Sequence, residues 1–132
     1  MMYRPAMTRF AIVALVLAAC GGSDNNTADA PKTIDSAPAT VQTVTCPATP
    51  AATVMTSGFM YAPVTTMINQ GQIVQFVMPA EHDAEPGHFD GTLADPGLTV
   101  DFNQTKCLMF TQSGMYGFHC GPHHFDGTIV VQ

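Results

Sequence analysis

The sequence has 132 residues, 46% of them hydrophobic and 11% charged, which suits a single modest globular domain rather than a disordered chain. Four Lys or Arg residues stand against ten Asp or Glu residues, which gives a net charge of −6 at pH 7. Because a protein holds a nucleic-acid backbone mainly through Lys and Arg, this balance argues against a nucleic-acid partner and favours a cation or a basic protein.

The first 19 residues predict an export signal. Arg4 and Arg9 precede an apolar run over residues 10–19, which is shorter than the roughly 20 residues needed to span a bilayer. The run ends in Leu-Ala-Ala-Cys, which resembles the bacterial lipobox, so Cys20 is the expected lipidated N-terminus. An ordinary signal peptide cut nearby is the alternative. The resemblance implies a protein of the bacterial cell envelope that is attached to the membrane only through its lipid. The default location is the outer membrane, with the protein facing the periplasm.

Residues 20–45 predict the lipidated cysteine and a flexible tether. They are mainly Ala, Thr, Pro, Asp and Ser, and they contain too few large apolar side chains to offset the entropy of ordering. Removal of residues 1–19 takes away both arginines and leaves two lysines against ten acids, a net charge of −8. The folded domain is therefore expected over residues 46–132.

Seven short segments of β-type sequence follow, separated by Gly, Pro, Asn and Asp. They are residues 53–60, 64–68, 72–78, 98–102, 106–111, 115–120 and 128–131. Residues 79–97 predict a long polar loop. The pentapeptide His-Phe-Asp-Gly-Thr occurs twice, at 88–92 and 124–128, and the sequence offers no reason for it. The strand spacing predicts an all-β antiparallel sandwich or barrel.

The alternation of side chains gives the strand over residues 115–120 an inner and an outer face. Tyr116, Phe118 and Cys120 share one face, and the two aromatic residues mark that face as the buried one. Cys120 is therefore expected to point inward, at the end of the sandwich. His119 is expected to point the other way.

The four cysteines constrain one another. With Cys20 assigned to lipid, Cys46 and Cys107 can form a disulfide in an oxidising compartment. This pairing leaves Cys120 free, and a free thiol in such a compartment is a liability unless a metal occupies it. Pairing of Cys120 with either of the other two is the alternative, and it would remove the metal site.

Cys120 and His123 can bind one metal ion from the same side. A thiolate and an imidazole on one short loop between strands select copper or zinc. A bare Cys-x-x-His pattern is common, and here its position after an aromatic strand makes it more specific. A further ligand must come from elsewhere in the fold.

The surrounding sequence reads Tyr-x-Phe-x-Cys-x-Pro-His over residues 116–123 and Gly-x-Ile-x-Val over residues 127–131. Upstream, it reads Tyr-Ala-Pro at 61–63 and has a Gly-x-x-Val turn at 71–74. Together these motifs resemble the plastocyanin and amicyanin branch of the cupredoxins, across about residues 53–132. The resemblance implies a Greek-key cupredoxin β-sandwich of about seven to eight strands, with one copper ion at one end. By position, it implies that His82, Cys120 and His123 are the copper ligands.

One departure from this family concerns the axial ligand, which is usually a Met shortly after the second His. No Met lies between Cys120 and the C-terminus. Asp126 and His124 are the side chains that could take the axial position, unless a backbone carbonyl takes it or it stays empty. His88 is the substitute for His82 if the loop folds differently. The axial ligand matters because it tunes the reduction potential.

The resemblance implies one-electron transfer by a monomer rather than enzyme catalysis. Its expected partner is a basic redox protein such as a cytochrome, with the acids between Glu81 and Asp90 as a docking patch. Buffering or delivery of copper is the alternative function, because the axial Met is missing and two further histidines are spare. A cupredoxin-like scaffold without metal is the third.

Overall fold

The computed structural model describes residues 39–132, which form nine strands and no helix. The strands are β1 (Val41–Val44), β2 (Ala52–Thr56), β3 (Tyr61–Ala62), β4 (Thr65–Ile68), β5 (Ile73–Val77), β6 (Glu85–Pro86), β7 (Thr105–Phe110), β8 (Gly114–His119) and β9 (Asp126–Val131). The predicted export signal, Cys20 and the predicted tether up to residue 38 lie outside the described residues. Within the described part, no helix is long and apolar enough to cross a membrane.

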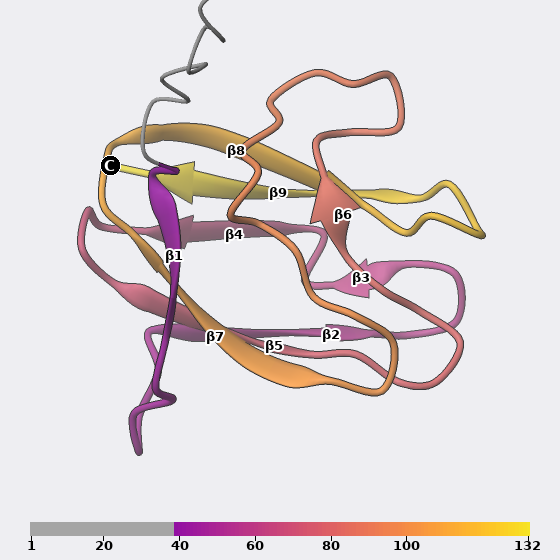
Figure 1. Ribbon diagram of the computed structural model, residues 1–132, viewed down its shortest axis with the longest axis horizontal. Helices are drawn as coiled ribbons and strands as arrows, with labels where there is room; N and C mark the ends of the chain where they lie inside the picture. The colour runs from indigo at the N-terminus through magenta and orange to yellow at the C-terminus, as the bar shows by residue number, and fades with distance from the viewer. Residues whose placement is uncertain (1–38) are drawn as a thin grey trace, which may run out of the picture. The chain divides into compact units, whose positions relative to one another are not determined.

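The strands form two sheets, so the predicted all-β sandwich is confirmed. One sheet has five strands in the order β1-β7-β5-β2-β3, and the other has four in the order β4-β9-β8-β6. Figure 1 shows β4, β8 and β9 on one side of the domain and β2, β5 and β7 on the other. Two pairs are parallel, β2 with β5 and β4 with β9, which corrects the expected antiparallel arrangement. The first pair is parallel because the chain crosses to the other sheet through β4 before it returns beside β2.

Strand β1 shows that the folded domain begins before residue 46, its predicted start. Val41–Val44 pairs with β7, and Val44 lies opposite Cys107. The buried carboxylate of Asp95 accepts hydrogen bonds from the backbone N–H and the hydroxyl of Thr40, at 3.0 and 2.6 Å. A four-residue edge strand in a polar segment has too little periodicity to be recognised in sequence, so the predicted tether is too long at its C-terminal end.

The predicted disulfide between Cys46 and Cys107 is confirmed. The pairing of β1 with β7 brings these residues together, and their Cα atoms lie 5.1 Å apart across a sequence separation of 61 residues. The alternative pairings with Cys120 are therefore wrong. Among the described residues, Cys120 is the free cysteine, and it is buried.

Residues 98–102 are not the strand that the sequence predicts. Their backbone makes one isolated bridge, between Val100 and Ala84. Leu98 and Val100 are nevertheless fully buried in the core. The apolar residues of this segment therefore indicated its burial correctly, but they did not indicate whether it pairs as a strand. Pairing also requires a neighbouring strand with free backbone groups.

Strands β3 and β6 have two residues each and are absent from the sequence-based prediction. The structure ends the predicted strand 53–60 at Thr56, and β3 follows separately. Strand β6 lies inside the predicted loop 79–97, and it pairs with β8, where Glu85 is opposite His119. Two residues cannot show a periodicity. Both strands border the end of the sandwich at which Cys120 lies.

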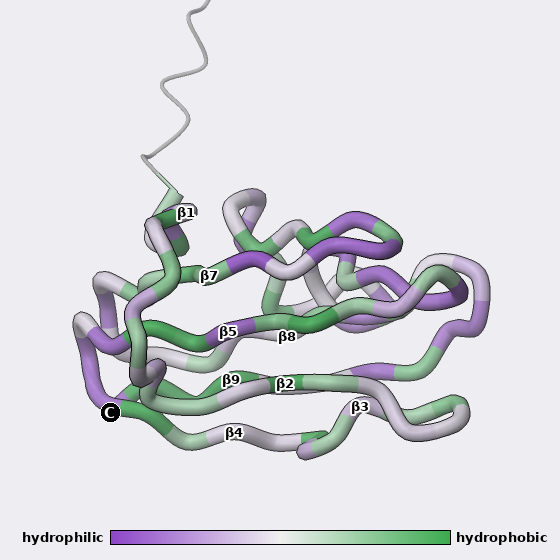
Figure 2. The backbone as a smooth tube through the Cα atoms, turned by 90° about the horizontal axis from the view of Figure 1, so that it is seen from below, coloured by the Kyte–Doolittle hydropathy of each residue, from purple (hydrophilic) through white to green (hydrophobic). Residues whose placement is uncertain are grey.

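The core lies between the two sheets and is aromatic near Cys120. Val74 and Phe76 of β5 are fully buried, as their alternation predicts. Figure 2 shows apolar stretches within β8 and β9 and hydrophilic stretches in the loops. The ring of Phe118 lies 4.5 Å from that of Tyr61 and 5.3 Å from that of Phe76, measured between centroids. This layer supports the residues that follow β8.

Candidate metal centre

Cys120 follows β8 and points inward, as the alternation predicts. Phe118 and Cys120 are both fully buried. Two backbone hydrogen bonds close a tight turn: the His124 N–H donates to the Cys120 carbonyl at 2.8 Å, and the Cys120 N–H donates to the Phe125 carbonyl at 3.0 Å. This turn, the ligand loop (residues 120–125), places His123 beside Cys120.

His82 comes from the loop after β5 and is 8% exposed. Its neighbour Asp83 fixes this part of the loop through two hydrogen bonds, one to its backbone and one to its side chain. The hydroxyl of Tyr61 donates a 2.7 Å hydrogen bond to the Asp83 carbonyl, and the carboxylate of Asp83 accepts one of 2.9 Å from the Gly121 N–H. These contacts tie the His82 segment to β3 and to the ligand loop.

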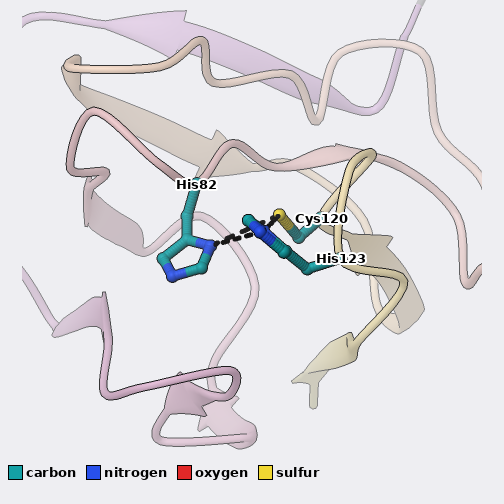
Figure 3. A group of neighbouring side chains, drawn as sticks. All are labelled: His82, Cys120 and His123. Atoms are coloured by element: carbon teal, nitrogen blue, oxygen red, sulfur yellow. Dashed lines mark hydrogen bonds between the residues drawn. The ribbon is translucent and has the colours of Figure 1, made fainter.

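Three donor atoms converge at this end of the sandwich. Nδ1 of His82 lies 3.1 Å from Nδ1 of His123, and Sγ of Cys120 lies 3.6 Å from each of them. Figure 3 shows the two imidazoles and the sulfur directed toward one another. Within residues 39–132, this is the only group of three or more His, Cys, Asp or Glu side chains close enough to share a metal ion. These are the three residues that the resemblance implied.

The chemistry of these donors fits a soft transition-metal cation. One thiolate and two imidazole nitrogens are ligands that copper favours. Burial raises the pKa of the Cys120 thiol above its ordinary value of 9.0, so the thiol keeps its proton at neutral pH until a cation displaces it. His82 and Cys120 are buried, whereas His123 is exposed, so the cluster meets solvent on the His123 side.

Aromatic rings surround the cluster. The ring of Phe59 lies 4.9 Å from that of His123 and 6.0 Å from that of His82. The ring of Phe125 lies 5.1 Å from that of His82 and 4.7 Å from that of Tyr61. Phe125 is partly buried against the core, whereas Phe59 is exposed, so the cluster is shielded from water on the Phe125 side and open on the His123 side.

Asp83 and Phe59 also belong to this site, although the sequence did not predict a role for either of them there. Asp83 directly follows the predicted ligand His82, and that position is the one signal that could have drawn attention to it. Phe59 lies in a segment that the sequence predicts as a strand, and the structure places it in the loop between β2 and β3. No sequence pattern indicates that this loop reaches His123.

The alternative ligands Asp126, His124 and His88 lie outside the cluster and have other partners. Asp126 Oδ1 accepts a 2.7 Å hydrogen bond from the Phe89 N–H, and the ring of His124 stacks on that of Phe89 with centroids 3.9 Å apart. Nε2 of His88 lies 2.9 Å from the hydroxyl of Thr128. Among residues 39–132, neither a carboxylate nor a third imidazole therefore joins the cluster.

No family model and no curated protein matches the chain. Among solved structures, a proline-to-glycine mutant of amicyanin in its reduced Cu(I) form at pH 4 matches with a TM-score of 0.57 and 20% identity, covering 70% of this chain and 99% of that one. Amicyanin from Paracoccus versutus (Thiobacillus versutus) matches with a TM-score of 0.54 and 21% identity, covering 71% and 99%. The chain has the amicyanin fold. A reduced tryptophan-to-tyrosine mutant of amicyanin agrees, with a TM-score of 0.55 and 22% identity over 70% and 99% of the two chains.

The amicyanin fold confirms the predicted cupredoxin β-sandwich, with nine strands in place of about seven to eight. The match extends over nearly the whole of each of these amicyanin chains. The fold explains how His82 and Cys120, which are 38 residues apart in the sequence, meet at one end of the sandwich.

Proposed function

We propose that this protein carries single electrons with one copper ion held by His82, Cys120 and His123. The observation that carries the proposal is the convergence of one buried thiol and two imidazole nitrogens within 4.8 Å of one another in an amicyanin fold. When bound, copper supplies a one-electron couple between Cu(II) and Cu(I). The amicyanins that share the fold were solved in reduced and Cu(I) forms. No enzymatic reaction forms part of this proposal.

Each residue of the site has a separate role in this proposal. Cys120 supplies the thiolate, which favours copper over harder cations, and His82 supplies a buried imidazole. Asp83 and the ligand loop hold these donors in place through the Gly121 hydrogen bond, so little rearrangement is needed between oxidation states. His123 is the exposed member, and it is the group that a redox partner can contact.

Copper stoichiometry and the Cu(II) absorption spectrum of the protein test the proposal. We expect one copper per chain, an intense band at red wavelengths from the thiolate, and a reversible Cu(II)/Cu(I) couple by voltammetry. Cys120→Ser is expected to abolish the band, and His82→Ala to weaken copper binding by more than about 100-fold, since even residues behind the ligands change metal affinity by 10- to 100-fold. A chain that binds no copper, or binds it without a reversible couple, contradicts the proposal.

A protein that buffers or delivers copper is the second candidate, and the exposure of His123 favours it. An exposed ligand gives a competing chelator or acceptor direct access to the ion. The two candidates differ in kinetics. Rapid transfer of Cu(I) to a chelator supports delivery, whereas slow transfer combined with fast redox cycling supports electron transfer.

The partner we propose is a basic redox protein, such as a cytochrome. Residues 39–132 contain seven acids against the single cation Lys106. Five of these acids lie in or beside the segments that form the candidate site: Glu81, Asp83, Glu85, Asp90 and Asp126. Electron transfer with a basic cytochrome is expected to slow as salt rises, because salt screens the attraction between opposite charges. A rate that does not change with salt in stopped-flow measurements would contradict this choice of partner.

We also propose an envelope location, with residues 1–19 as the export signal and Cys20 as the lipid anchor in the outer membrane. The Cys46–Cys107 disulfide supports this, since disulfides persist in oxidising compartments. A mass spectrum of the mature N-terminus is expected to show acyl groups on Cys20. An unacylated N-terminus would reject the anchor and leave an ordinary signal peptide.

A further inference from the structure

The two copies of the His-Phe-Asp-Gly-Thr pentapeptide contact each other in the fold. The first copy, residues 88–92, lies after β6, and the second, residues 124–128, runs from the ligand loop into β9. Three contacts join them, through Phe89 to His124, Phe89 to Asp126 and His88 to Thr128. A repeat that is unexplained in the sequence thus becomes one contact region beside the candidate metal centre.

Phe89 makes two of these contacts, one through its side chain and one through its backbone. Its ring lies nearly parallel to the imidazole of His124, at an interplanar angle of 22° and a centroid distance of 3.9 Å. Its backbone N–H donates a 2.7 Å hydrogen bond to Asp126 Oδ1. One side chain and one N–H therefore hold the chain on both sides of Phe125.

The first copy is itself anchored to β8, so it can act as a fixed support. The Gly87 N–H donates to the Gly117 carbonyl at 2.8 Å, and the Gly117 N–H donates to the Leu93 carbonyl at 2.9 Å. His119 donates from Nδ1 to the Gly87 carbonyl at 2.7 Å. A Cβ on Gly117 would approach Cδ2 of His88 to 2.7 Å, so the glycine is needed for this close approach.

The second copy needs such a support because its backbone is locally unfavourable. His124 has a φ of +57°, in the left-handed region that residues other than Gly adopt at a cost. It directly follows His123, which is the exposed member of the cluster and whose ring is contacted by those of Phe59 and His82. The backbone at His124 sets the direction from which the His123 side chain leaves the chain, so the turn at His124 contributes to the orientation of that imidazole.

We propose that Phe89 is a positioning residue for His123: it holds the left-handed turn at His124 and thereby keeps the exposed imidazole directed at Cys120 and His82. This inference rests on the proposed copper site for its consequence, but the positioning itself is a property of the copper-free protein. Without the Phe89 ring, the turn at His124 relaxes and His123 samples orientations away from the cluster. The buried donors His82 and Cys120 stay in place.

The test compares Phe89→Ala with Phe89→Tyr, which keeps the ring, and with Met115→Ala, which truncates an apolar side chain of the same exposure on β8. Phe89 and Met115 are each 55% exposed. In copper-free protein, NMR contacts between the rings of His82 and His123 are measured for all three. In the copper-loaded protein, the Cu(II) spectrum and the rate of Cu(I) loss to a chelator are measured.

Phe89→Ala is expected to lose the contacts between the two imidazoles, to shift the Cu(II) spectrum, and to release Cu(I) on the order of 3- to 10-fold faster, as removal of a stacked pair implies. Phe89→Tyr and Met115→Ala are expected to behave as the native protein does. A folded Phe89→Ala protein whose imidazole contacts are unchanged overturns the inference, whether or not the native protein binds copper. Absence of copper binding in the native protein overturns the proposed function alone.

Discussion

At the scale of single residues, Gly127 shows how closely the aromatic layer approaches the backbone. It lies in β9, and a Cβ built on it would overlap the ring of Phe118 and would lie 2.9 Å from Cδ2 of Tyr61. Both rings are almost fully buried, so neither can move aside without disturbing the packing below the candidate site. Glycine is needed here for space and not for an unusual backbone angle.

We therefore predict that Gly127→Ala destabilises the protein by about 1–3 kcal/mol, as is typical of overpacking in a core. Urea unfolding monitored by circular dichroism measures the change. Gly121→Ala is the matched control, because a Cβ there meets at 3.0 Å only the end of the flexible and half-exposed Glu85 side chain. A Gly127→Ala protein as stable as this control would contradict the prediction, because it would show that the rings of Phe118 and Tyr61 can move to accept the extra methyl group.

At the scale of elements, strand β1 is fastened at both of its ends. Thr40 precedes the strand and is bound by the buried carboxylate of Asp95, while Cys46 follows it and is bonded to Cys107 of β7. Strand β1 is an edge strand of four residues, and backbone pairing alone stabilises so short a strand weakly. The two attachments explain how a polar N-terminal segment keeps its place in the sheet.

Replacement of both Cys46 and Cys107 by Ala is predicted to lower the free energy of unfolding by about 2–4 kcal/mol, since the bond closes a loop of about 60 residues. Unfolding in guanidinium chloride measures the loss, and hydrogen exchange is expected to rise first in β1. Copper binding is expected to survive, because neither cysteine belongs to the cluster. Loss of the copper spectrum in a folded double mutant would show that β1 and the candidate centre are coupled.

At the scale of the whole molecule, two buried groups are expected to lower the stability of the copper-free protein at alkaline pH. Burial raises the pKa of the Cys120 thiol above 9.0, and burial raises the pKa of the Tyr61 phenol well above its ordinary value of 10.0, with the nearby charges of Cys120 and Asp83 adding to the effect. Above these ordinary values, the unfolded chain releases protons that the folded chain keeps. Folding therefore loses stability as pH rises.

We predict a free energy of unfolding that is unchanged by these two groups below about pH 8 and falls above pH 9, with a slope of up to roughly 1.4 kcal/mol per pH unit for each group. Urea unfolding of the copper-free protein between neutral and alkaline pH measures it. Cys120→Ser is expected to move the start of the decline to higher pH, because only Tyr61 then contributes. A decline that is identical in the two proteins would contradict the role of Cys120.

Local sequence was enough to predict the features that depend on neighbouring positions. Strand alternation indicated the inward direction of Cys120, and the apolar segments indicated most of the strands. The spacing of Cys120 and His123, with its resemblance to cupredoxins, indicated the ligand loop. These features could be predicted because they follow from the pleat of one strand and the length of one loop, which the local sequence specifies.

The folded chain was needed to establish which distant residues meet. It placed His82 rather than His88 beside Cys120, joined Cys46 to Cys107, and showed β3 and β6, which are too short for any pattern. It also placed Phe89 on the turn that follows His123. The physical reason is the same in each case: these contacts form between segments far apart in sequence, and their free energy depends on sheet order and packing, which no local periodicity encodes.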